Sequence, residues 1–181
     1  QVPYTDGMTG RDLLEMEDPV MGKVTVQNLV GRFSRTPAEI RDTGDSFGGH
    51  DQKILSEWLK FGEEEIAAAQ GKRERAAPGP DTPPSPTPTE GMALSSLRVL
   101  DVGSGLAGSF AATLLADFGA EVVKVEEPGV GDTLRHLPPF YDESPLWWAV
   151  EGRNKKSVTL DLRREEGRET FLRLAALSDV V

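Results

Sequence analysis

The clearest pattern of apolar and polar positions lies in the second half of the chain. Residues 97–102 form a short apolar run rich in β-branched side chains, and residues 121–125 form a second such run. Between them Phe110, Leu114 and Phe118 recur at a spacing of four residues, which is typical of a helix. The pattern predicts a strand, a helix and a second strand, and the two strands of such a βαβ unit are parallel.

The same alternation continues to the end of the chain. Residues 146–150 are apolar and predicted to be buried, residues 157–160 predict a third strand, and residues 178–181 begin a fourth. Between these strands a helix is predicted to turn Phe171, Leu174 and Ala175 inward. The succession predicts an α/β fold with a Rossmann-like, doubly wound parallel sheet, of which residues 92–181 form a part.

Residues 1–70 have a different pattern, made of short elements with few apolar side chains. We predict a helix over residues 11–17, a strand at residues 24–26, a short extended piece near Phe33, a helix capped by Asp51 and a last helix over residues 63–70. The Asp51 helix has one apolar face, formed by Ile54, Leu55, Trp58 and Leu59. This small α+β segment is too thin to hold a core of its own, so we expect it to pack on another layer.

Proline marks the boundary between these two parts. Residues 71–91 are charged at first and then rich in proline, with six prolines from Pro78 to Pro88. Proline at this density excludes helix and central strand. We therefore predict a disordered linker at 71–91, a first segment at 1–70 and a second at 92–181.

Composition excludes several classes of function. The net charge is −10 without a basic cluster, which argues against nucleic acid as a partner. No apolar run approaches the roughly 20 residues that span a bilayer, and no signal peptide opens the chain. Cysteine is absent and there are two histidines, so no metal site is predicted and a cytoplasmic location fits. The chain starts without Met and stops inside an apolar run, and we interpret it as a piece of a longer protein.

The turn after the first predicted strand carries the candidate chemistry. It matches the pattern G-x-G-x-x-G at Gly103, Gly105 and Gly108, and Glu126 closes the second strand. Glycines let a ligand approach the backbone, while the helix that follows offers unpaired N–H groups and the positive end of its dipole. The turn fits a nicotinamide or flavin dinucleotide, S-adenosylmethionine, or the phosphates of a nucleotide such as coenzyme A (CoA). A tight turn without a ligand is the remaining alternative.

The blocks around the turn resemble one family. LRVLDVGSGLAG, LLADFGAEVVKVEEPGVGD, RNKKSVTLDLRREEGRE and SDVV are similar to the N-terminal part of class III CoA-transferases, the CaiB/BaiF or formyl-CoA transferase-like family. MGKVTVQNLVGRFSRTPAEIR and SFGGHDQKILSEWLKFGEEEIAAA resemble the C-terminal end of the same family, with Asp51 in place of the usual Thr or Ser. The order implies a tandem protein in which one unit ends, a linker follows and a second unit begins.

The resemblance implies an enzyme that moves CoA between an acyl-CoA and a small carboxylic acid through an aspartyl thioester. It places the nucleophilic aspartate beyond Val181, so no catalytic residue is predicted in this chain and the isolated piece is expected to be inactive. Asp101 is expected to cap the turn. The residues that the resemblance assigns to CoA binding are Ser104, Gly105, Leu106, Ala107, Leu160 and Arg163.

Five charged positions carry further expectations. Arg163 could pair with the 3′-phosphate, and Arg135 is a second cationic candidate. Glu127 falls where some family members place an arginine over the adenine. Lys155 and Lys156 are expected to form a solvated turn.

Alternatives stay open at this point. An acyl-CoA racemase of the same family would share these blocks, and the donor and acceptor acids are not fixed by the sequence. A methyltransferase or an NAD(P)-binding domain would explain the glycine turn, with Glu126 on the ribose, but would leave the RNKKSVTLDLRREEGRE block unexplained. Family members form interlocked dimers, so the parent is expected to be a dimer or an internal pseudo-dimer.

Overall fold

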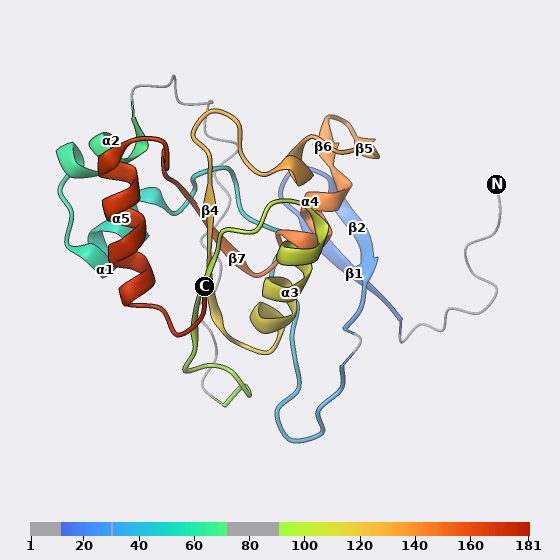
Figure 1. Cartoon of the computed structure of the whole chain (residues 1–181). Helices are drawn as coiled ribbons and strands as arrows, with labels where there is room; N and C mark the ends of the chain where they lie inside the picture. Colours follow the sequence, from blue (N-terminus) through green and yellow to red (C-terminus); the bar gives the residue numbers. More distant parts are fainter. Residues whose placement is uncertain (1–11, 30, 72–90) are drawn as a thin grey trace.

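The computed structural model describes residues 12–29, 31–71 and 91–181, and a three-stranded parallel sheet lies at the centre of this part of the chain (Figure 1). Its strands are β3 (Arg98–Asp101), β4 (Glu121–Glu126) and β7 (Lys155–Thr159), in the order β3-β4-β7. The mixed α/β class with a parallel sheet, as predicted, is confirmed. The predicted fourth strand is reduced to one parallel bridge, which pairs Val180 with Val99 on the free side of β3.

Helices cover both faces of this sheet (Figure 1). One face carries α3 (Leu106–Asp117) and α4 (Leu146–Glu151). The other carries α1 (Asp51–Leu59), α2 (Glu63–Gln70) and α5 (Glu165–Ala176). The described residues also form the antiparallel pairs β1 (Leu13–Asp18) with β2 (Gly22–Gln27) and β5 (Phe140–Tyr141) with β6 (Ser144–Pro145), and a short 3₁₀ helix, η1 (Thr133–Arg135).

The first segment shares its core with the second. One hydrophobic cluster joins side chains of α1 and α2 to the sheet and to α5; its buried members include Ile54, Leu55, Ile66, Val123, Val158 and Leu174. The half-buried Trp58 adds a contact, because the Arg98 guanidinium lies 4.7 Å from the centre of its ring. Residues 12–71 therefore dock on residues 91–181, a point that the sequence left open.

Polar contacts fix the same docking at the turn before β7. The Asn154 side chain donates to the Glu39 carbonyl at 2.9 Å and accepts from the Arg41 backbone N–H at 2.7 Å. The buried Arg153 binds Asp117 at 2.7 Å. Burial raises the pKa of Asp117, while its bonds to Arg153 and Asn154 oppose that rise. Each of these side chains forms a hydrogen bond with a buried polar group. Without that bond, burying the polar group would lower the stability of the fold.

Two predicted elements of the first segment are wrong. The helix expected over residues 11–17 is the strand β1, whose Leu14 pairs with Val26 of β2. Phe33 lies in no strand and is exposed. In a segment of six residues, the alternating apolar pattern of a strand is hard to distinguish from the apolar spacing of a helix. Here the pairing with β2 makes the segment a strand. The helix over residues 63–70 and the strand at residues 24–26 are confirmed.

Asp51 and α3 also differ from expectation. His50, not Asp51, is the N-cap of α1; the Asp51 carboxylate instead accepts from the Thr159 N–H at 2.6 Å and from its hydroxyl at 2.8 Å. On α3 the buried positions are Ser109, Ala112, Thr113, Ala116 and Asp117. Phe110, whose spacing from Leu114 and Phe118 predicted the helix, is 45% exposed. Small side chains let α3 approach the sheet closely, and its larger apolar residues are displaced outward.

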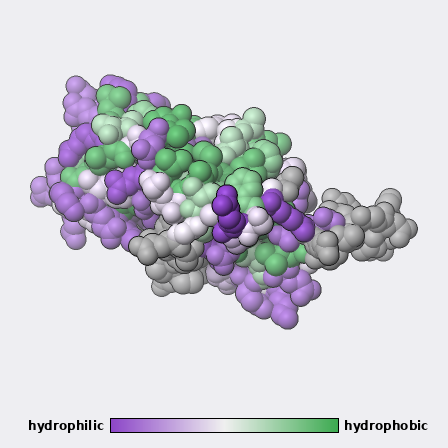
Figure 2. Space-filling view, turned by 90° about the horizontal axis from the view of Figure 1, so that it is seen from below, coloured by the Kyte–Doolittle hydropathy of each residue, from purple (hydrophilic) through white to green (hydrophobic). Residues whose placement is uncertain are grey.

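Seen from the end where the strands begin, apolar side chains gather across the middle of the surface, with hydrophilic groups around them (Figure 2). Among the described helices, none combines the length and the apolar character that crossing a membrane requires.

Candidate functional site

The glycine turn between β3 and α3 is built from three glycines with different roles. Gly105 has φ of 80° and ψ of −166°, a combination that is essentially restricted to glycine. A Cβ on Gly103 would lie 3.0 Å from the Cα of Gly108, and the reverse contact is equally short. The turn therefore needs a glycine at position 105 for its backbone conformation. It needs glycines at positions 103 and 108 because a side chain on either would prevent the close contact between the turn and the helix. The Asp101 carboxylate accepts from the Gly103 N–H at 3.0 Å, which confirms its expected role as a cap of the turn.

A cavity of about 320 Å³ opens at the carboxyl ends of the three parallel strands. Ser104 from the glycine turn, Leu160 after β7 and Arg163 beyond it all line this cavity. Gly105, Leu106 and Ala107 continue from Ser104 into the start of α3 and do not line it in the described part of the chain; Leu106 and Ala107 are exposed there. The structure thus brings three of the six predicted residues to one cavity and the other three to the adjoining start of a helix.

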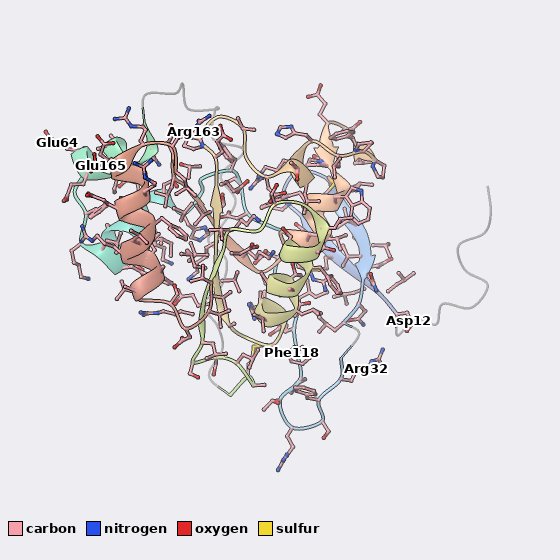
Figure 3. The ribbon with its side chains drawn as sticks, in the orientation of Figure 1. Asp12, Arg32, Glu64, Phe118, Arg163 and Glu165 are labelled. Carbon is pink, nitrogen blue, oxygen red and sulfur yellow. The ribbon has the colours of Figure 1, made fainter. Side chains whose placement is uncertain are left out.

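Arg163 lines this cavity and lies near the top of the view in Figure 3, well above Phe118, which follows α3. Its side chain is 58% exposed and binds Asp161 at 3.0 Å and Glu127 at 2.8 Å. The hydrogen bond that the guanidinium donates to Asp161 leads the effects that raise its pKa, so the group keeps its charge. Glu127 therefore binds Arg163, the residue that was predicted to pair with the 3′-phosphate.

Arg135 serves a different purpose from the one expected. Its guanidinium donates to both carboxylate oxygens of Glu126, at 2.7 and 2.8 Å, and to the Asp45 carbonyl at 3.1 Å. Its central carbon lies 3.5 Å from the centre of the Trp148 ring. These contacts fix Arg135 in a half-buried position beside a second cavity, of about 260 Å³, which Trp148 and Asp45 also line.

Glu126 has little capacity left for a ligand. The Glu126 side chain is fully buried and accepts from Arg135, from the Ser157 hydroxyl at 2.5 Å and from the Asp132 N–H at 2.8 Å. A methyltransferase or an NAD(P)-binding domain would need this carboxylate on a ribose. A ribose could reach it only by displacing one of these partners, which disfavours both alternatives.

The turn at Lys155 and Lys156 is not solvated, and that prediction is wrong. Lys155 is buried and donates to Asp101 at 2.9 Å and to the Ser109 carbonyl at 2.7 Å, while Lys156 binds Glu121 at 2.5 Å. Burial lowers the pKa of Lys155, and the charge of Asp101 opposes that shift.

A third buried lysine, Lys124 in β4, was missed altogether. Its ammonium lies 2.8 Å from Asp132 and 3.3 Å from Asp101. The sequence did contain one signal for it. A lone lysine inside the apolar run of a central strand is buried, and a buried ammonium requires an acidic partner.

Within the described residues, no group of three or more histidine, cysteine or acidic side chains is placed to hold a metal ion. The carboxylates near the cavity instead take lysine, arginine or backbone N–H partners, as described above. What the site offers is a glycine turn, a helix N-terminus and a mouth framed by Arg163 and Glu127, an arrangement suited to a nucleotide.

Comparisons with known proteins find matches mainly in the second segment of the chain. The family model of CoA-transferase family III matches residues 94–181. The alpha subunit of succinyl-CoA–L-malate CoA-transferase from Chloroflexus aurantiacus is 45% identical over 114 residues, which cover 61% of this chain and 27% of that protein. Succinyl-CoA–D-citramalate CoA-transferase from the same organism is 52% identical over 89 residues, covering 49% and 22%.

Among solved structures, a CAIB/BAIF family protein from Brucella suis is 38% identical, with 49% of this chain and 25% of that chain covered and a TM-score of 0.45. The chain spans only about a quarter of the length of these relatives. Residues 94–181, just under half of this chain, therefore match CoA-transferase family III.

Proposed function

We propose that this chain is part of an enzyme that transfers CoA from an acyl-CoA to a carboxylic acid, and that the cavity at the carboxyl ends of β3, β4 and β7 holds the CoA nucleotide. The observation that carries the proposal is that Ser104, Leu160 and Arg163, distant in sequence, line that one cavity. The match of the same residues to the model of CoA-transferase family III supports it. The relatives' names suggest succinyl-CoA as the donor.

In the chemistry proposed, an aspartate outside residues 1–181 attacks the thioester carbonyl of the acyl-CoA and releases the CoA thiolate. The thiolate then attacks the aspartyl carbonyl of the resulting anhydride, which frees the donor acid and leaves an aspartyl thioester. The acceptor carboxylate takes up CoA by the reverse sequence. Residues of this chain bind and orient the nucleotide, and alone they are proposed to give no turnover. A racemase of the same family is the second candidate, because it would use the same nucleotide site.

We further propose that residues 1–70 end one CoA-transferase unit and residues 92–181 begin a second, in a Rossmann-like domain. The shared core of α1, α2, α5 and the sheet supports this organisation, since each part covers apolar surface of the other. A parent with two units could then pair them within one chain. A monomer mass for the full-length parent in solution would support such pairing, and a tight dimer of tandem chains would contradict it.

Calorimetric titration with CoA, NAD and S-adenosylmethionine tests the ligand. We expect this chain to bind CoA in preference to the other two, and Gly105→Ala to weaken CoA binding at least tenfold, because alanine is strained at that φ and reshapes the turn. Gly22→Ala is the matched control: its φ is 72° and no atom lies within 4 Å of the added Cβ, but it lies in the β1–β2 hairpin, outside the cavity lining. Tighter binding of NAD or S-adenosylmethionine, or equal CoA affinity in both variants, would refute the proposal.

A further inference from the structure

Lys124 does not line the candidate nucleotide cavity, but it binds two residues that do, one in each of two loops that form its walls. The residue is 1% exposed in the middle of β4, and its ammonium donates to the Gly103 carbonyl in the glycine turn. The same nitrogen lies 2.8 Å from an Asp132 carboxylate oxygen in the loop after β4. It also lies 3.3 Å from Asp101 at the end of β3 and 3.3 Å from the Ser109 hydroxyl in α3. Gly103 and Asp132 both line the cavity, so Lys124 joins two loops of its lining, which also meet where the Ser104 hydroxyl lies 3.3 Å from the Thr133 hydroxyl.

The partners of Lys124 themselves hold local structure. The other carboxylate oxygen of Asp132 accepts from the Leu134 N–H at 2.8 Å and so caps η1. The second oxygen of Asp101 is held by Lys155. An ammonium has three donors and no acceptor, and here it is surrounded by acceptors only. Without it, the Gly103 carbonyl and the Asp132 carboxylate would lose their shared donor inside the protein, where such a loss is costly.

We infer that Lys124 is a positioning residue of the nucleotide site: it holds the glycine turn and the loop at Asp132 at the separation that the nucleotide requires, without touching the nucleotide. The inference rests on the proposed function for its ligand. The part of the inference that says Lys124 holds the two walls together does not depend on the ligand. It can be tested by measuring the order of the backbone at both walls in the absence of any ligand.

Another buried lysine provides the control. Lys156 in β7 is also buried and also paired, with Glu121 at the start of β4. Neither Lys156 nor Glu121 lines the cavity. Replacing either lysine by methionine removes one buried charge, which is paired with Asp101 and Asp132 at Lys124 and with Glu121 at Lys156. Both changes should therefore lower stability. Only the change at Lys124 removes contacts with cavity walls.

The experiment compares Lys124→Met and Lys156→Met in the full chain, by calorimetric titration with CoA and by amide hydrogen exchange. We expect Lys124→Met to weaken CoA binding about tenfold or more, because misplaced walls lose contacts with the ligand. We also expect faster exchange at the amides of residues 103–106 and 132–135. Lys156→Met should keep CoA affinity within about twofold and leave those amides protected.

A folded Lys124→Met protein with wild-type CoA affinity and unchanged exchange at both walls would overturn the inference. If Lys124→Met does not fold, Asp132→Asn replaces it, since it neutralises the acid on one wall and can keep the acceptor for Leu134; wild-type affinity and exchange in this variant would equally overturn it. If the wild-type chain binds no CoA, the proposed function fails, while the exchange comparison still decides whether Lys124 holds the two walls.

Discussion

Replacing Ile54 by alanine tests whether the first segment is part of the sheet's core. Ile54 lies on α1 with 0% exposure, in the cluster that contains Val123 of β4 and Leu174 of α5. The change removes three carbon atoms, which at about 0.8 kcal/mol for each buried methylene is about 2.4 kcal/mol of transfer free energy. The cavity left behind adds to this, so we expect a loss of about 3 to 4 kcal/mol in the free energy of unfolding.

Urea unfolding followed by tryptophan fluorescence and by far-ultraviolet circular dichroism measures this loss. Gln52→Ala is the control, because Gln52 is exposed on the same helix, and it should change stability by less than about 0.5 kcal/mol. The two probes should give the same midpoint, since α1 and the sheet would unfold together. A loss below about 1 kcal/mol for Ile54→Ala, or an early fluorescence transition that leaves the sheet folded, would refute the shared core.

Three further outcomes are expected. Glu127→Arg should raise the affinity for CoA relative to 3′-dephospho-CoA about threefold to tenfold in calorimetric titrations, because it replaces the acid that binds Arg163 with a cation; an unchanged ratio would contradict the placement of the 3′-phosphate. Asp117→Asn should cost about 3 to 5 kcal/mol in denaturant unfolding, since it leaves the buried Arg153 without its carboxylate, and full stability would show that the pair contributes nothing. A protease site inserted within residues 72–90 and then cut should leave two pieces that co-elute in size-exclusion chromatography, and their separation would argue against docking.

The elements that the sequence predicted well are those with local signals. The strands β3 and β4 are short β-branched runs separated by a glycine turn and a helix, and the helix at Glu63–Gln70 begins with three acids. Acidic residues suit a helix N-terminus by charge alone. The neighbouring residues alone determine such elements, so their types and positions could be predicted without information on distant contacts.

The errors concern features decided by distant residues. A lysine in a turn suggests solvent, yet Lys155 is buried because Asp101 lies beside it across 54 positions of sequence. In the same way Arg135 was a reasonable phosphate ligand until the fold placed Glu126 and Trp148 around it. Ser104, Leu160 and Arg163 could be selected through the family resemblance, but neither their convergence on one cavity nor the ion pair that holds Arg163 can be read from spacing.

The position of Arg135 links docking of the first segment to the nucleotide site. Its guanidinium joins Glu126, which lines the candidate cavity, to the Asp45 carbonyl in the first segment. Loss of residues 12–71 would remove one of these anchors from the loop that carries Asp132. Linkage is reciprocal, so if docking orders the cavity, a ligand in the cavity must strengthen docking by the same free energy. CoA should therefore lower the equilibrium Kd between the two pieces after a cut within residues 72–90, and a Kd that is indifferent to CoA would show that the two events are independent.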